Sequence, residues 1–375
     1  MSEQETNAPA PKKPNQVAVR KTKLQGLGEE AFQSPQLSLF QNFLANTPSE
    51  RDKLSNTIAL WDSIPRYSIS RSLQYKLRTE HGTLELLKLN FRHNKQDYLA
   101  TITPARIEIK DGPDKGKTVD YYPSATEEIV EDVLRKMAAD QEQQQGFFDK
   151  KGYVSGVAFS LYQLREELSK LGHTRSYSEI VLSLEILHKT NIQITTTDGR
   201  EEQVRSSTYF PAMGTARRKD IDADPSARWG IQFHPLVTRS IDELTYRQFN
   251  YHQLMSHRSQ LTRWIHKQLV MKFTFAEIGG LFKMKFSTIK RDSALLTGYK
   301  QDRQAVVAVA ESFEELKKSG LLMDFEKGNE TRGPRNKFVD VEFILTPSIT
   351  FVREVRAANK RRQLAGAQDQ TIVIE

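Results

Sequence analysis

Two stretches of this 375-residue chain have the same order of elements: a helix, a short turn, a second helix and a hairpin. In the first stretch, leucines recur on one face of a helix over 160–172, which Gly172 ends. A second amphipathic helix follows over 173–190, and Asp198-Gly199 predicts a hairpin turn. A helix-turn-helix followed by a hairpin is the plan of a winged helix.

The second stretch lies in the last third of the chain. Apolar residues at helical spacing predict a long helix over 250–273 and a third helix over 301–320. Between them, 283–300 is predicted to form a short strand and then a helix with Ser287 as its cap. The segments 321–325 and 337–345 have the alternation of wing strands. The sequence therefore predicts an α+β fold with two tandem winged-helix domains.

The expected domain boundaries follow from composition and periodicity. Residues 1–55 are rich in Pro, Gln, Asn, Ser and Lys and lack periodicity, so we expect a disordered N-terminal tail. The first winged-helix domain is predicted over 56–240 and the second over 245–352. Residues 353–375 carry "REVRAANKRRQ" and are predicted to form a basic, frayed tail.

The net charge of +8 is concentrated in one part of the chain. The segment 245–362 has 22 Lys+Arg and 12 Asp+Glu, whereas the remainder has 33 and 35. A basic domain joined to a near-neutral one is typical of proteins that bind a polyanion, most often nucleic acid. A basic surface without a partner is the alternative.

Several classes of protein are disfavoured by composition. The chain has no cysteine, which excludes disulfides and thiolate metal sites and fits a reducing cytoplasm. It has no run of about 18 apolar residues for a membrane span, and its start lacks the apolar core of a secretory signal. We therefore expect a cytoplasmic protein that does not enter the membrane.

The third helix of the second copy is the candidate for the major groove of double-stranded DNA, because its first residues would meet base edges. The residues that we expect to contact DNA are Lys300, Gln301, Arg303 and Gln304 at the start of this helix, Lys290 and Arg291 on the preceding helix, and Arg332, Arg335 and Lys337 in the wing. Arg can bind guanine and Gln can bind adenine, whereas the other cations suit phosphates. For each single residue, a solvated helix face is the alternative.

The equivalent helix of the first copy has few cations beyond Arg175 and Lys189. We therefore expect the first domain to serve in dimerisation or in contacts with the DNA backbone.

Three sequence patterns could indicate an enzyme, but each lacks a feature that the corresponding site requires. The segment 112–118, "GPDKGKT", leaves one residue too few between its glycines for a phosphate-binding loop. The aspartates of "DIDAD", 220–224, lie in a polar linker beside "ARRK". The eight histidines form no HxH pair to hold a metal beside a nucleophilic Tyr. We expect no catalytic residue, no metal and no cofactor.

A short apolar segment interrupts the polar tail. Gln36, Leu37, Ser38, Leu39 and Phe40 can lie extended in a groove of a partner, which would bury the three apolar side chains. The pentapeptide resembles the motif that binds the bacterial sliding clamp. Packing of the tail onto its own domain is the alternative.

A "QLSLF" tail followed by two winged-helix units resembles the TrfA-type plasmid replication initiators. The similarity is clearest at "FSLYQLREELSKLG" (159–172), at 105–134 and at "FEELKKSGLL" (313–322). The long insertion at 211–228 and the segment "FTFAEIGGLFKM" depart from that pattern.

The resemblance implies a bacterial, plasmid-associated protein that binds repeated origin sites (iterons). It also implies recruitment of the host initiator, the replicative helicase and the sliding clamp, a part in plasmid copy control, and a homodimer that exchanges with a monomer. Two rivals remain at this point: a winged-helix transcriptional repressor, and an origin-nicking or primase-like enzyme.

Overall fold

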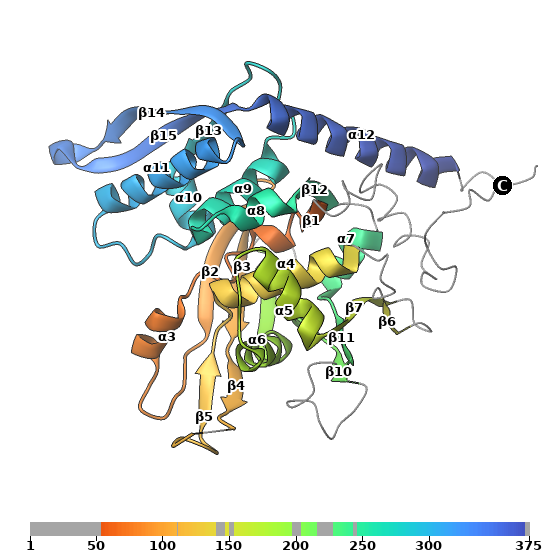
Figure 1. Ribbon diagram of the computed structural model, residues 1–375. Coiled ribbons are helices and arrows are strands. Elements are labelled where there is room, and N and C mark those ends of the chain that lie inside the picture. The colour runs from red at the N-terminus through yellow and green to blue at the C-terminus, as the bar shows by residue number, and fades with distance from the viewer. Residues whose placement is uncertain are drawn as a thin grey trace, which may run out of the picture.

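The computed structural model of the protein describes residues 54–110, 112–139, 147–149, 154–196, 204–215, 228–242 and 246–371. Within these residues the chain forms two units that lie one above the other, as Figure 1 shows. The segments 33–42 and 220–224, the Asp198-Gly199 turn and most of the insertion 211–228 lie outside the described residues.

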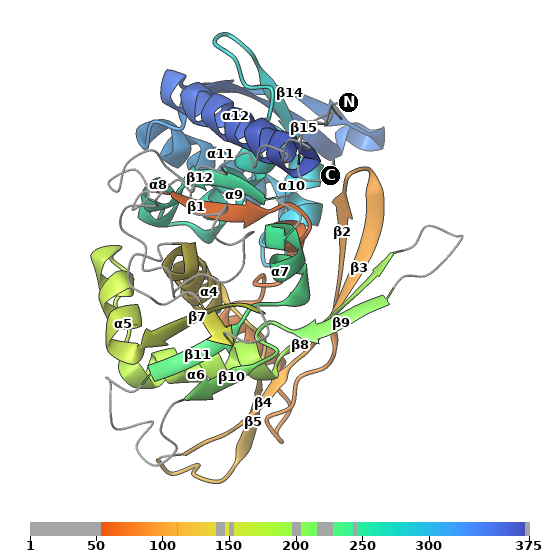
Figure 2. The same ribbon diagram turned by 90° about the vertical axis from the view of Figure 1, so that its right-hand side faces the viewer.

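The first unit mixes three small antiparallel sheets with helices. Its elements are, in chain order, β1 (Leu54–Ile58), the 3-10 turn η1 (Trp61–Ser63), α3 (Arg71–Leu77), β2 (Leu87–His93), β3 (Gln96–Thr103), β4 (Ala105–Glu108), β5 (Thr118–Tyr121), α4 (Ala125–Ala139), β6 (Phe147–Asp149), β7 (Val154–Ser160), α5 (Leu161–Lys170), α6 (Tyr177–Lys189), β8 (Asn191–Thr196), β9 (Val204–Thr208), β10 (Met213–Thr215), β11 (Arg228–Gln232) and α7 (Pro235–Asp242). The strands pair in the orders β2-β3-β8-β9, β10-β11-β7-β6 and β4-β5, and Figure 2 shows the first of these sheets along one side of the unit.

The predicted helix-turn-helix of the first unit is confirmed. Both helices begin with a capping box, in which Ser160 pairs with Gln163 and Ser176 with Glu179, so that the first backbone N–H groups have acceptors. Gly172 lies between the helices at φ 76°, a left-handed conformation that glycine adopts without strain. The segment 112–118 joins β4 to β5 as a hairpin loop rather than leading into a helix.

The second unit has the order that the sequence predicts for a winged helix. Its elements are, in chain order, β12 (Tyr246–Asn250), α8 (Tyr251–Ser256), α9 (Gln260–Lys272), β13 (Phe282–Lys285), α10 (Phe286–Ser293), α11 (Asp302–Lys318), β14 (Leu322–Arg332), the 3-10 turn η3 (Pro334–Asn336), β15 (Phe338–Pro347) and α12 (Ile349–Thr371). The sheet has the order β13-β15-β14, and α11 packs on it through Phe313, whose ring lies 5.5 Å from Phe325 and 5.0 Å from Phe343.

Four local predictions need correction. The helix predicted over 250–273 is two helices, α8 and α9, because Ser259 accepts a hydrogen bond from Thr262 and starts a new helix. The predicted frayed tail 353–375 is helical as far as Thr371, in α12. Strand β1 already begins at Leu54, inside the predicted tail.

The fourth correction concerns the start of α10. The sequence suggests Ser287 as its cap, but this residue lies within the helix and donates from its amide and its hydroxyl to the Asp340 carboxylate of β15. The two hydrogen bonds therefore fix α10 to the wing, and Lys285 is the N-cap residue at which the helix starts.

The two units share their interior. Strand β1 pairs antiparallel with β12, from Leu54 opposite Asn250 to Ile58 opposite Tyr246. Most of the buried apolar side chains of both units belong to one continuous cluster, and Ala105, Ile107 and Ile186 of the first unit form a second, small one. In Figures 1 and 2, α8, α9, β1 and β12 lie between the body of the first unit and the wing sheet of the second. The β1–β12 pairing and the shared core thus hold the second unit in place on the first.

Candidate nucleic-acid interface

Helix α11 is held by one face and leaves the other to solvent. Ala305, Val309, Phe313 and Leu316 recur at helical spacing and are buried against the second unit. The opposite face begins at Arg303 and runs along the helix in contact with water. In Figure 1 the start of α11 and the β14–β15 hairpin extend toward the same side of the molecule. This is the arrangement that helix-turn-helix docking in a groove requires.

Four predicted contact residues lie at the start of this helix or just before it. Lys300, Gln301, Arg303 and Gln304 are all exposed. Neither Lys300 nor Arg303 forms an ion pair with any residue in the described part of the chain. The unpaired N–H groups of the first turn add the positive end of the helix dipole to these charges. The first turn of α11 therefore offers cations and amides to an anionic partner.

The two predicted residues of α10 are in a different situation. Lys290 is ion-paired with Asp302 of α11, and Arg291 makes a two-point contact with Asp292, at 2.7 and 3.0 Å. The hydrogen bond to Asp292, with its negative charge, raises the pKa of the Arg291 guanidinium. Both side chains remain partly exposed, at 39% and 44%. They fasten α10 in place, and their charge is already partly neutralised.

Of the three predicted wing residues, Arg332 already has a carboxylate partner, whereas Arg335 and Lys337 have none in the part of the chain that the structure describes. Arg332 donates to Glu330 at 2.5 Å and to the Asn336 carbonyl at 3.3 Å. Arg335 and Lys337 are exposed at the hairpin turn and form no ion pair within the described residues. Arg335 and Asn336 have φ of 58° and 59°, an uncommon left-handed conformation for residues with side chains. The turn thereby presents two free cations beside the hairpin end.

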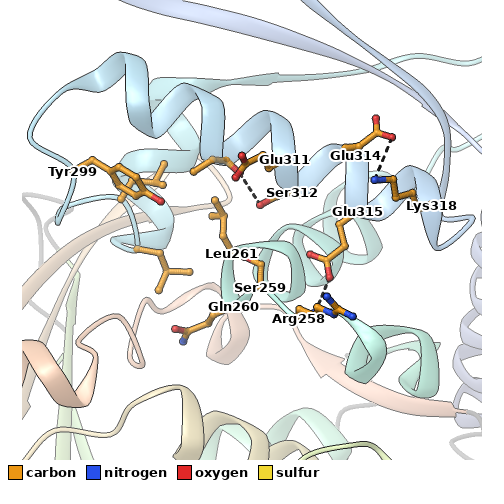
Figure 3. A pocket seen from close by; sticks show the side chains of 13 residues that line it. Arg258, Ser259, Gln260, Leu261, Tyr299, Glu311, Ser312, Glu314, Glu315 and Lys318 are labelled. Carbon is orange, nitrogen blue, oxygen red and sulfur yellow. Dashed lines mark hydrogen bonds and ion pairs between the residues drawn. The ribbon is translucent and has the colours of Figure 1, made fainter.

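The far half of α11 carries three glutamates and two lysines, and Lys317 is already paired with Asp324 at 2.7 Å. Glu311 is exposed and Glu314 is half-buried on the solvent side, where Lys318 lies 4.0 Å from Glu314. Figure 3 shows the pocket of about 660 Å³ beside this half of the helix. Its lining is rich in carboxylates, so it does not suit an anionic ligand. Within the described residues, the cation of α11 without a carboxylate partner is thus Arg303 in the first turn, because Lys317 and Lys318 at the far end are paired.

The polar groups of that pocket serve to join helices. The Glu315 carboxylate accepts from the backbone N–H of Arg258 at 2.6 Å and from the Thr262 hydroxyl at 2.5 Å. Because Arg258 and Thr262 flank the start of α9, this carboxylate holds α11 against that helix. In Figure 3, Glu315 points from α11 toward Arg258. The pocket therefore explains how α11 is oriented, and we assign no ligand to it.

The first unit's helix α6 lacks a comparable surface. Its start carries the capping box of Ser176 and Glu179, and Lys110 of the β4–β5 hairpin pairs with Glu185 farther along at 2.9 Å. Six of its residues are buried against the unit. The structure therefore leaves the second unit as the better candidate for base contacts.

The first unit contains a group of buried charged side chains that the sequence did not predict. Asp62 accepts from Arg66 at 3.1 Å and from Arg135 at 2.9 Å, and Glu131 accepts from Arg66 at 3.0 Å and from the Trp61 indole at 2.6 Å. Burial raises the pKa of Asp62, but Arg135, Lys267 and Arg66 outweigh it and hold that pKa well below its ordinary value. Hydropathy patterns do not mark buried charges, and the positions in α4 read as an ordinary solvated face.

Other kinds of site are not evident in the described part of the chain. No group of three or more His, Asp or Glu side chains there is arranged to hold a metal ion. None of the helices described there is both long enough and apolar enough to cross a membrane.

Comparisons with known proteins give only distant likenesses. No family model and no curated protein matches the sequence. Domains 2 and 3 of RctB align with 81% of this chain and 100% of their own, at TM-score 0.46 and 9% identity. A second structure of the same domains covers 75% of this chain and 99% of its own, at TM-score 0.41 and 10% identity.

The Pi initiator protein, in a crystal structure with iteron DNA, aligns with 59% of this chain and 91% of its own. The TM-score is 0.33 and the identity 8%. Likenesses at this level do not assign a family to this chain.

Proposed function

We propose that the protein is a replication initiator that binds repeated sites in double-stranded origin DNA through the first turns of α11. The proposal rests on Lys300 and Arg303, which are exposed and have no ion-pair partner among the described residues. They lie at the start of α11, a helix whose other face is packed against the second unit. A guanidinium and two amides at such a position can form the paired hydrogen bonds that distinguish guanine and adenine in the major groove. The protein acts by binding rather than by catalysis.

The wing adds contacts that hold the protein on the duplex. Arg335 and Lys337 lie at the turn of the β14–β15 hairpin, beyond the sheet that packs against α11. Cations there suit phosphates, which contribute affinity that falls with salt and carries no sequence information. We assign base reading to α11 and positioning to the wing.

Recruitment of the bacterial sliding clamp is the second part of the proposal. It rests on residues 36–40, "QLSLF", which lie outside the described residues. Two leucines and a phenylalanine next to a glutamine amide suit an apolar groove with one polar contact. Exchange between a dimer and an active monomer, and contacts with the host initiator and helicase, belong to the same proposal.

The experiment uses the purified full chain and a library of random double-stranded DNA. Repeated rounds of binding should enrich one short motif, and its affinity should fall steeply with salt, by a log-log slope of about −0.9 for each phosphate contact. The motif should then occur in several copies in the replicon that encodes the protein. Failure to enrich any motif would contradict DNA-site recognition.

The same data separate an initiator from a repressor. Several spaced copies beside an A/T-rich segment would support an origin, whereas a single copy overlapping a promoter would favour a transcriptional repressor. A pull-down with the purified sliding clamp is the independent check, because a repressor has no use for that contact.

A further inference from the structure

We propose that Val307 reads the methyl group of a thymine in the major groove, about two base pairs from the base that Arg303 reads. The inference rests on the proposed function and deepens it, since it assigns the chemistry of one base in the bound site. It concerns a residue that lies one turn further along α11 than the candidates found by sequence analysis.

Val307 has an unusual position for an apolar side chain. It is 55% exposed and follows Arg303 by four residues, so the two side chains lie on the same face of α11. Val307 is the large apolar residue on the solvent side of α11. Its neighbours on that side are Gln304, three residues earlier, and Glu311, four residues later. A single valine is therefore inserted in the polar face that would meet DNA.

Local stability does not explain the valine. Alanine occupies positions 305, 308 and 310 of the same helix, and alanine favours a helix by several tenths of a kcal/mol over valine. A β-branched side chain also holds one rotamer in a helix, so its two methyl groups are fixed in direction. Val307 therefore lowers the helix propensity and faces water, and its side chain is held in one direction. These properties suit contact with an apolar group of a partner.

The major groove offers one such group. Thymine alone among the four bases presents a methyl there, and apolar side chains recognise it by contact. Ala308 and Ala310, which follow Val307 in the helix, are partly buried against the core, so of these three apolar side chains only that of Val307 is exposed. The carboxylate of Glu311 begins one turn later and would be repelled by phosphates. Val307 is thus at the end of the surface that can enter the groove.

The spacing predicts where the thymine lies. Four residues of α-helix advance about 6 Å, and successive bases on one strand are about 3.4 Å apart along the duplex. A helix lying along the groove would therefore place the thymine about two base pairs from the guanine that Arg303 binds.

The test uses the duplex that the full-length protein selects from a random library. Each thymine is replaced in turn by deoxyuridine, which keeps the pairing and the hydrogen bonds and removes only the methyl. Binding is measured for the wild-type protein and for Val307→Ala, a change that raises helix propensity and so should not unfold the helix. Val339→Ala, at a 54% exposed valine of the wing, is the matched control.

One deoxyuridine should weaken wild-type binding by about fourfold, which corresponds to about 0.8 kcal/mol for one apolar carbon. The same replacement should have no effect on Val307→Ala and its full effect on Val339→Ala. If every deoxyuridine duplex binds the wild type as well as the parent duplex, or if Val307→Ala still distinguishes the two, the inference is wrong while the proposed function stands. If no duplex is selected at all, the proposed function fails and the inference with it.

Discussion

The ammonium group of Lys267, in α9, lies 2.7 and 2.9 Å from the two carboxylate oxygens of Asp132, in α4. Glu128 of α4 is a further partner at 3.5 Å. All three side chains are almost fully buried, at 4–8% exposure. Burial alone would lower the pKa of Lys267, but the charges of Asp132 and Glu128 outweigh it and raise that pKa. This contact joins a helix of the second unit to a helix of the first, so it sets the base on which α11 is presented.

Replacing Lys267 with methionine should destabilise the protein by about 3–5 kcal/mol, because two buried carboxylates lose their cation. The free energy of unfolding in urea is the measurement. Lys283→Met is the matched control, since the Lys283 side chain is 60% exposed and its pair with Glu342 at 3.1 Å should be worth at most about 1 kcal/mol. Equal losses for the two variants would contradict a special role for the buried pair.

Arg303→Ala should weaken binding to the selected DNA site by about 1–3 kcal/mol and relax the preference at one base pair. The exposed Arg353 of α12 provides a control, because Arg353→Ala removes the same charge from another surface. Binding is measured as a dissociation constant at fixed salt. An unchanged constant for Arg303→Ala would mean that a different helix reads the DNA.

Asp302→Asn should raise the affinity for any duplex, whatever its sequence. The change removes the only carboxylate of the first turn of α11 and frees Lys290 from its ion pair. The salt dependence of binding should become steeper by about one unit in log-log slope, as for one more phosphate contact. The check is a salt titration with a selected and a scrambled duplex; a gain limited to the selected site would argue against a phosphate effect.

The stability of the fold should decrease as the pH falls from about 6.5 toward 4. Burial lowers the pKa of His257 to about 4 and that of His234 to about 3. His266, 3.0 Å from His257, has its pKa lowered by burial and by the neighbouring charge of His257. Below pH 6.5 the unfolded chain binds protons that these folded histidines do not, which favours unfolding by about 1.4 kcal/mol per pH unit for each histidine.

Urea midpoints at pH 7 and pH 5 test this expectation. The exposed His81 is the control, because His81→Gln should leave the pH dependence as in the wild type. A midpoint that stays constant or rises at pH 5 would show that the buried histidines do not control stability in this range.

The double change Leu39→Ala with Phe40→Ala should abolish binding to the sliding clamp and leave DNA binding unchanged. The reason is that the two side chains would fill the clamp groove but take no part in α11 or the wing. A pull-down with clamp and a binding assay with the selected duplex measure the two activities. Loss of both together would instead indicate that the pentapeptide is part of the protein's own fold.

Much of this fold could be predicted because its signals are local. The helices α5, α6 and α11 follow from apolar spacing within single segments, and Ser160 and Ser176 mark two of their starts. The break between α8 and α9 was missed because apolar spacing continues across it. Only the hydrogen bond of Ser259 shows where the second helix begins.

The features that were missed depend on residues distant in sequence. Helix α12 packs against β12, about a hundred positions earlier, and Asn359 accepts there from Arg247 at 2.7 Å. At the candidate interface, the sequence alone predicts that Lys290 and Arg291 are cations available to DNA phosphates. The Asp302 partner of Lys290 became known only when the fold brought the two side chains together, whereas Arg291 pairs with Asp292, its neighbour in the sequence. The number of cations in a segment therefore overstates the charge that a surface can offer.

On the proposed function, Glu311 and Glu314 limit how many bases one copy of the protein can inspect, because the lysines farther along α11 are already paired with carboxylates. A duplex can approach the first two turns but is repelled by the third. So short a contact holds little information, and a genome would contain many chance matches to it. If the protein is the initiator proposed above, several copies bound next to one another would supply the discrimination, since each occupied position raises the local concentration for the next. An array of repeats would be the form of target that this helix is able to find.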